Sequence, residues 1–179
     1  MTTETTYNCT SSIKVANYYQ HCFNHHVHGV QTVAEALPNS CNTFFITMGQ
    51  KMGKQTFTKY FEAFGFTETT GIDLPSEAVP IAGKTYYPVD KMGIAELSSA
   101  SFGQTFQVSP IQMITAVASL GNGGKLMTPY VVKQVLDENG NILQTRANII
   151  ERIHIPIGYN IFNFDFTPNI TSRPLENGL

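Results

Sequence analysis

The sequence predicts a mainly helical α+β fold, and three local patterns support that prediction. Two runs, 44–52 and 57–64, repeat apolar side chains at the spacing of one helical face. Residues 109–112 have the pattern of a helix start, with a serine cap, a proline in the first turn and a glutamine that completes a capping box. Asn139-Gly140, between two apolar runs, is the strongest short-range signal for a β-hairpin.

The first half of the chain predicts three helices after a polar start. Residues 1–29 give no clear element, and 31–37 predict a short helix that ends near Pro38, because the residue before a proline avoids the helical region. The next helix ends at Gly53 and places on one face Phe44, Phe45, Met48 and Met52. The third ends at Gly65 and carries a stripe of Phe57, Tyr60, Phe61 and Phe64. We expect these Phe and Met side chains to form the core.

The second half predicts one irregular stretch, one helix and one hairpin. Residues 66–100 contain several breakers, namely Gly71, Pro75, Pro80, Gly83 and Pro88. The capped helix runs from Pro110 through Ile114, Val117 and Leu120 to Gly121, with Val108 placed to contact Met113. Two strands then flank Asn139-Gly140, and residues 146–179 show no period of either kind.

Composition excludes several classes of function. Charged residues are 13% of the 179-residue chain, about half the usual share of roughly 25%. The net charge of −2 and the absence of a Lys/Arg cluster give no case for nucleic-acid binding. No apolar run reaches the roughly 18 residues of a membrane span, and we expect neither an anchor nor a signal peptide in this chain. The three cysteines, Cys9, Cys22 and Cys41, allow at most one disulfide.

A dense group of possible metal ligands lies early in the chain: His21, Cys22, His25, His26 and His28. Zinc accepts such ligands. However, no second Cys or His pair follows at the spacing of a zinc finger, and Cys41 stands alone in the sequence. We therefore expect no metal site and no cofactor.

Ser40-Cys41-Asn42 interrupts the apolar pattern between two predicted helices. These residues could cap a helix within a plain turn. They could also form a reactive corner, since a hydroxyl both accepts and donates a proton and a carboxamide orients an amide without adding charge. A second candidate, Ser11 with Lys14, has the form S-x-x-K, but its neighbours are typical of a turn and we expect it to be a chance match.

Several segments of the sequence, taken in their order along the chain, resemble those of a known family. They include the segments TVAEAL, NSCNTFF, YFEAFGFTETTGIDLPSEA, ELSSASFGQTFQVSPIQMITAVASLGNGGKLMTPYVV and VLDENGNIL. With Ser40-Cys41-Asn42 as the S-x-N motif, they resemble the transpeptidase domain of class B penicillin-binding proteins, nearest to the sporulation and cell-division members. The resemblance is clearest over 28–144. It implies a partial domain over 1–145 with the serine β-lactamase-like fold, followed by an unmatched tail over 146–179.

The resemblance implies a role in peptidoglycan cross-linking. In this family a serine attacks the D-Ala-D-Ala end of a stem peptide and passes the acyl group to a neighbouring strand, and β-lactams acylate the same serine. By resemblance, Ser40 relays protons, Asn42 binds the substrate amide, and Cys41 points away from the cleft. Stem peptides, β-lactams and other cell-wall synthesis proteins are the implied partners, at the outer face of the bacterial cytoplasmic membrane.

Two of the family's three motifs have no match. Ser11 lies too close to Ser40 to be the family's S-x-x-K serine, and Lys84-Thr85 is followed by Tyr86 rather than by the glycine of K-T-G. The resemblance therefore implies a transpeptidase fragment that is not active by itself. The alternatives are a non-catalytic peptide-binding or scaffold module, or a fragment related to serine β-lactamases.

Overall fold

The computed structural model describes residues 2, 4–145 and 149–152. The N-terminal elements are β1 (Thr6–Cys9), β2 (Ser12–Val15), β3 (Tyr18–His21), the 3-10 turn η1 (Phe23–His25) and β4 (Gly29–Thr32). The helices are α1 (Val33–Ala36), α2 (Asn42–Met52), α3 (Lys54–Ala63), α4 (Ile94–Ser101) and α5 (Pro110–Gly121). The remaining strands are β5 (Lys125–Met127), β6 (Gln134–Leu136), β7 (Ile142–Thr145) and β8 (Ile149–Arg152). The α+β class predicted from the sequence is confirmed.

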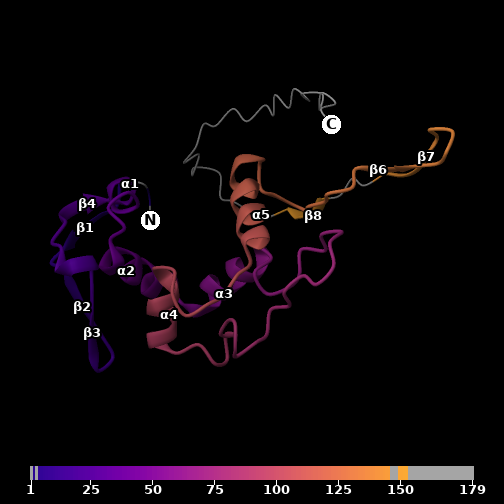
Figure 1. The fold of residues 1–179 in the computed structure, drawn as a ribbon. Coiled ribbons are helices and arrows are strands. Elements are labelled where there is room, and N and C mark those ends of the chain that lie inside the picture. The colour runs from indigo at the N-terminus through magenta and orange to yellow at the C-terminus, as the bar shows by residue number, and fades with distance from the viewer. Residues whose placement is uncertain (1, 3, 146–148, 153–179) are drawn as a thin grey trace.

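Among the described residues, the strands form four separate antiparallel pairs, β1 with β4, β2 with β3, β5 with β8, and β6 with β7. Strands β1, β2 and β3 lie within residues 1–29, to which the sequence assigned no element, whereas β4 includes Gln31 and Thr32, which were predicted to begin the short helix. Each has only four residues, and β1 is completed by a distant partner, with Thr6 opposite Thr32. Figure 1 shows these strands gathered around one end of α2.

Helix α2 packs most extensively against α4. Its buried side chains are those of Thr43, Phe44 and Ile46, and Gly49 lies against Ser101 of α4. The predicted buried face is therefore partly wrong: Phe45 and Met48 are only half-buried, and Met52 is 42% exposed. The close contact at Gly49 turns a face with small residues, rather than the Met side, toward α4.

The aromatic stripe of α3 is also less buried than predicted. Phe57, Tyr60, Phe61 and Phe64 are all half-buried, and the fully buried side chain on this helix is Thr58. Phe61 lies at the centre of an aromatic cluster, with ring centroids 6.1 Å from Phe57, 5.0 Å from Phe66, 6.1 Å from Tyr86 and 5.3 Å from Phe106. The stripe thus packs against loop side chains rather than inside a deep core.

Helix α4 falls within and just beyond the stretch predicted to be irregular, so that prediction is wrong for residues 94–100. The helix begins after Gly93, whose backbone N–H donates to the Glu96 carboxylate at 3.0 Å. Its sequence is rich in alanine and serine, so no stripe of large apolar residues marks it. Residues 66–93 are irregular as expected, except for an isolated bridge between Ala82 and Tyr86.

Helix α5 begins and ends where the sequence predicts. The Ser109 hydroxyl accepts from the Gln112 N–H at 3.3 Å, and the Gln112 side chain accepts from the Ser109 N–H at 2.9 Å. Its buried side chains are Gln112, Ala116 and Ser119. The large apolar side chains lie on the open side and are exposed: Met113, Ile114, Val117 and Leu120.

The predicted hairpin is confirmed, with β6 and β7 joined by a turn at Asn139-Gly140. Figure 1 shows it extending away from the rest of the fold. Residues 149–152 of the expected tail form β8, which pairs with β5, and residues 153–179 lie outside the described residues. No helix of the described residues is both long enough and apolar enough to cross a bilayer.

Candidate functional site

The candidate site is a tight corner between α1 and α2. Helix α1 is fixed by a capping box, in which the Thr32 hydroxyl accepts from the Glu35 N–H at 3.3 Å and the Glu35 carboxylate accepts from the Thr32 N–H at 2.7 Å. This pattern is legible in the sequence as T-x-x-E. The corner itself closes through the Cys41 N–H, which donates to the Ala36 carbonyl at 3.1 Å.

Ser40 has an unusual backbone conformation at this corner. Its φ is +48°, in the left-handed region, and its N–H donates to the Leu37 carbonyl at 3.0 Å. Non-glycine residues adopt this region rarely, and such positions are enriched at functional sites. The left-handed step exposes the Ser40 side chain while Cys41, one residue later, is fully buried.

Ser40 and Asn42 face one open pocket of about 630 Å³. Its other lining residues are Phe23, Asn24, His26, His28 and Asn39. Ser40 lies two residues before α2, the helix that carries Phe44, and Ser40 and Asn42 line the same concavity. The pocket has the volume of a small-molecule or peptide site, for which about 300–1,000 Å³ is usual.

The Asn42 side chain is held in place from the N-terminal strands. Its Nδ2 donates to the backbone carbonyl of His21 at 2.9 Å. A carboxamide carries two N–H donors and one acceptor oxygen, so this contact uses one donor. Beside the Ser40 hydroxyl, the pocket therefore presents an uncharged group able to orient an amide.

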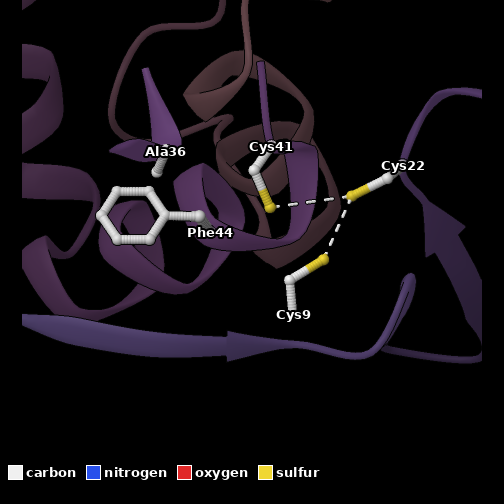
Figure 2. Close-up of a cluster of buried hydrophobic side chains, with 5 residues drawn as sticks. All are labelled: Cys9, Cys22, Ala36, Cys41 and Phe44. Atoms are coloured by element: carbon white, nitrogen blue, oxygen red, sulfur yellow. Dashed lines mark hydrogen bonds between the residues drawn. The ribbon is translucent and has the colours of Figure 1, made fainter. Parts of the chain in front are cut away.

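Cys41 faces the opposite way, into a cluster of sulfur atoms. Figure 2 shows the thiols of Cys9, Cys22 and Cys41 pointing toward one another. The Cys22 Sγ lies 3.6 Å from the Cys9 Sγ and 3.7 Å from the Cys41 Sγ, and all three thiols are free. The His28 Nδ1 lies 3.4 Å from the Cys9 Sγ. Thr43 lies beside them, with its hydroxyl 3.3 Å from the Cys9 Sγ.

The cluster places the thiols in different electrostatic environments. Burial by itself raises the pKa of the Cys9 thiol. Hydrogen bonds with the Thr43 side chain and with the backbone of His28 and Ser11 lower this pKa by more than burial raises it, so that the pKa is about 6. Burial raises the pKa of the Cys41 thiol to about 11, against the lowering effect of the Thr43 hydroxyl.

Within the part of the chain that the structure describes, the residues that could hold a metal ion are Cys9, Cys22, His28 and Cys41. The donor atoms of Cys9, Cys22, His28 and Cys41 all lie within 4.8 Å of one another. Cys41 is isolated in the sequence, but the structure places it beside Cys9, Cys22 and His28, so the prediction that it stands alone is wrong. Cys9 and Cys22 are 13 positions apart and Cys22 and Cys41 are 19 apart, so no finger-like pair marks the cluster in the sequence.

The two discounted motifs do not form reactive groups in the structure. Ser11 occupies a turn with a φ of +77°, and Lys14 lies on the exposed side of β2, so the S-x-x-K residues do not share a helical turn. Lys84-Thr85 lies in a turn closed by the Lys84 N–H, which donates to the Ile81 carbonyl at 3.0 Å.

Comparison with known proteins gives a consistent assignment. The family model described as the penicillin binding protein transpeptidase domain matches residues 1–155. Stage V sporulation protein D of Bacillus subtilis is 40% identical over 116 residues, covering 65% of this chain and 17% of that protein. Peptidoglycan D,D-transpeptidase MrdA of Acinetobacter baumannii is 31% identical over 111 residues, covering 59% of this chain and 16% of that protein. The chain thus spans about a sixth of these two curated relatives.

Solved structures give the same fold. A peptidoglycan synthetase from Bifidobacterium adolescentis aligns with a TM-score of 0.74 at 20% identity, covering 85% of this chain and 27% of that one. The D,D-transpeptidase domain of a peptidoglycan glycosyltransferase from Eggerthella lenta aligns with a TM-score of 0.67 at 22% identity, covering 83% and 38%. Penicillin-binding protein 2 in a complex with MreC from Helicobacter pylori aligns with a TM-score of 0.64 at 24% identity, covering 73% and 25%.

Proposed function

The chain belongs to the penicillin-binding protein transpeptidase family, and on that premise we propose that it forms the S-x-N side of the cleft of a peptidoglycan D,D-transpeptidase. The observation that carries the proposal is the shared pocket of Ser40 and Asn42, at a corner held by both α1 and the N-terminal strands. The relatives named as D,D-transpeptidases support the reaction class.

In this proposal Ser40 relays a proton during acyl transfer. The nucleophilic hydroxyl must lose a proton as it attacks the stem-peptide carbonyl, and the leaving D-Ala amine must gain one. The exposed Ser40 hydroxyl can accept the first proton while donating its own, without forming an ion. The nucleophile is not Ser11, because Ser11 and Lys14 do not share a helical turn.

Asn42 acts as a positioning and binding group. Its contact with the His21 carbonyl fixes the side chain, so that its remaining polar atoms meet the substrate amide without further loss of rotamer freedom. Since neither Ser40 nor Asn42 carries a charge, this side of the pocket suits the neutral amide backbone of a D-Ala-D-Ala stem peptide or of a β-lactam.

The proposed partners and location follow from the family. We place the complete protein at the outer face of the bacterial cytoplasmic membrane, where peptidoglycan is cross-linked, with a role in sporulation or cell division. The solved complex of penicillin-binding protein 2 with MreC supports association with other cell-wall proteins.

A chimera tests the roles of Ser40 and Asn42. Residues 28–144 replace the matching segment of stage V sporulation protein D, and acylation by a fluorescent penicillin is timed on denaturing gels. Ser40→Ala should slow acylation by about 100-fold or more, the usual range for a lost proton-transfer group. Asn42→Ala should slow it by about 100-fold, as for a lost transition-state hydrogen bond. Gln55→Ala, at an exposed position of α3 that does not line the pocket, is the control and should leave the rate within about threefold.

Each alternative has its own outcome. If Ser40→Ala and Asn42→Ala leave the acylation rate of the chimera unchanged, these residues have no role in acylation, and Ser40-Cys41-Asn42 is a plain turn between two helices. The 179-residue chain, incubated alone with the same penicillin, should give no labelled band. A band that disappears in Ser11→Ala would instead make Ser11 the nucleophile and refute the assignment above.

A further inference from the structure

Gln31 has a buried side chain with an unused hydrogen-bond donor. It lies on β4, opposite Tyr7 of β1, and is 3% exposed. Its Oε1 accepts from the Asn39 Nδ2 at 2.9 Å, but no group accepts from its Nε2. Within the part of the chain that the structure describes, this Nε2 is the one buried side-chain nitrogen or oxygen without a partner. A buried donor left unpaired costs free energy, so its presence calls for an explanation.

Asn39 carries the complementary unused group. A carboxamide has two N–H donors and one acceptor oxygen. Two carboxamides can therefore form a pair of hydrogen bonds, in which each nitrogen donates to the oxygen of the other. Gln31 and Asn39 form only one of these two bonds, so that among the described residues the Gln31 Nε2 remains an unused donor and the Asn39 Oδ1 an unused acceptor. This arrangement keeps the Asn39 oxygen available for another donor.

The Asn39 side chain lies at the pocket of Ser40 and Asn42. It is exposed and lines that pocket, directly before Ser40 in the chain. Its main chain is held by α1, because the Asn39 N–H donates to the Glu35 carbonyl at 3.2 Å. Among the described residues, no Asp, Glu, Lys or Arg lines this pocket. The lining therefore suits a ligand that is recognised through neutral amide groups.

We propose that Asn39 is a substrate-binding residue, whose Oδ1 accepts a hydrogen bond from a backbone N–H of the stem peptide, and that Gln31 is the positioning residue that orients it. The bond from the Asn39 Nδ2 to Gln31 occupies the nitrogen and leaves the oxygen for the ligand. Asn42 retains one N–H after its bond to the His21 carbonyl. The two asparagines thus offer one acceptor and one donor, which match the N–H and C=O of a peptide backbone. The identity of the ligand rests on the proposed transpeptidase function.

A purely structural role accounts for less of this arrangement. A glutamine that only linked β4 to the corner would be more stabilising with both bonds of the pair, or if replaced by an apolar side chain without an unpaired donor. Because Asn39 is exposed, water can replace Gln31 as its partner, so their single bond adds little stability. What the bond adds is orientation, since a carboxamide that is fixed before binding loses less rotamer freedom when the ligand arrives.

Gln31→Met separates the two roles. Methionine is unbranched and flexible, and it removes the unpaired N–H together with the bond to Asn39. The melting temperature of the full 179-residue chain should therefore stay equal or rise, whereas its affinity for substrate should fall. The probe is acetyl-L-Ala-D-Ala-D-Ala, titrated while the side-chain amide signals of Gln31 and Asn39 are followed by NMR. Its Kd should rise by about 3- to 10-fold, the loss expected for one hydrogen bond. Gln55→Met, exposed on α3 and outside the pocket, is the matched control and should leave the Kd unchanged.

Methylated probes identify the proposed hydrogen bond itself. Asn39→Ala should raise the Kd of the tripeptide by about 3- to 10-fold. Each of three N-methylated forms of the tripeptide lacks one amide N–H. One of them should bind the parent chain more weakly by a similar factor, and Asn39→Ala should weaken its binding no further, because the same bond cannot be lost twice. An unchanged Kd in Asn39→Ala, or losses that multiply for all three methylated forms, overturns the role of Asn39.

Failure of this inference can be told apart from failure of the proposed function. If Gln31→Met lowers the melting temperature and leaves the Kd unchanged, Gln31 is a structural residue and its positioning role is refuted. A parent chain that does not bind the tripeptide also refutes the inference. Slow acylation of the penicillin chimera with Ser40→Ala, together with an unchanged tripeptide Kd in Asn39→Ala, would leave the transpeptidase role intact and overturn only the role of Asn39. Tripeptide binding that depends on Asn39 supports the inference whatever the chimera shows.

Discussion

The Ser101 Oγ occupies the place that a Cβ at Gly49 would need. Ser101 cannot easily move away, because its hydroxyl donates to the Leu97 carbonyl at 2.6 Å. Gly49 therefore allows α2 and α4 to approach closely, and the packing of α2 behind the S-x-N corner depends on a missing side chain.

Gly49→Ala should destabilise the fold despite the better helix propensity of alanine. Overpacking costs about 1–3 kcal/mol, whereas alanine gains only about 0.5–1 kcal/mol within a helix. The free energy of unfolding in urea gives the measurement. Gly121→Ala, at a helical glycine with nothing near its Cβ position, is the control and should be neutral or slightly stabilising. Equal effects at the two glycines would show that the α2–α4 contact is not tight.

Gln112→Glu should destabilise the chain more than the loss of the cap alone. The Gln112 Nε2 donates to the Gly65 carbonyl at 3.1 Å and to the Glu68 carbonyl at 2.7 Å, joining α5 to the loop after α3. A glutamate keeps the acceptor of the capping box but has no N–H, so both carbonyls lose a donor, at about 1–3 kcal/mol. Ser109→Ala reports the cap alone, at about 1 kcal/mol. Equal free energies of unfolding for the two variants would contradict this role of Gln112.

The hairpin turn should loosen at low pH. The Asn141 side chain donates to the Asp137 carboxylate at 2.8 Å, as does the Asn141 N–H, and these bonds hold the pKa of Asp137 below its ordinary value of 3.8. Because the folded pKa is lowered, the stabilisation is complete above about pH 4 and is lost as pH falls through the folded pKa. Amide shifts of Asn139 and Asn141 measured against pH should show the transition. It should vanish in Asp137→Asn and remain in Glu138→Gln.

The open face of α5 should bind hydrophobic dyes. Ile114 is 64% exposed and Val117 is 56% exposed, beside the exposed Met113 and Leu120. Each large apolar side chain left in water forgoes about 1.5–3 kcal/mol of burial free energy, and such patches favour association. Ile114→Lys with Val117→Lys should lower dye fluorescence and the self-associated fraction in sizing experiments. Ala118→Lys, also exposed on α5, adds a charge without removing a large side chain and should change both less. A monomeric chain that binds no dye would argue against this exposed face.

Local signals predicted those elements whose ends are set by their own residues. Helix α5 has its cap, proline and capping box within four residues, and the hairpin has its Asn-Gly turn. The N-terminal strands and α4 lack such signals. Strand β1 is completed by β4, and α4 is held by α2 through Gly49, so both depend on contacts between distant segments that a sequence pattern does not show.

In the candidate site, too, the sequence indicated the part that depends on neighbouring residues and missed the part that depends on distant ones. The polar break at Ser40 and Asn42 was visible because it interrupts two apolar periods, and the structure places both residues in one pocket. The thiol cluster was not visible, since Cys9 and Cys41 belong to different elements and only the pairing of β1 with β4 and the packing of α2 bring them together. Helical spacing also misplaced the buried side of α2, because a close contact at a glycine outweighs the positions of large side chains.

At Ser40 the backbone conformation and the side chain favour different residues: the left-handed φ favours glycine, whereas the hydroxyl in the pocket requires a side chain. Glycine adopts this conformation freely, whereas an L side chain there costs about 1–2 kcal/mol. Ser40→Gly should therefore make the chain more thermostable while removing the hydroxyl from the pocket. A search for variants by heat resistance alone would select glycine at this position, and the most heat-resistant chain from such a screen would lack the hydroxyl to which we assign the proton relay.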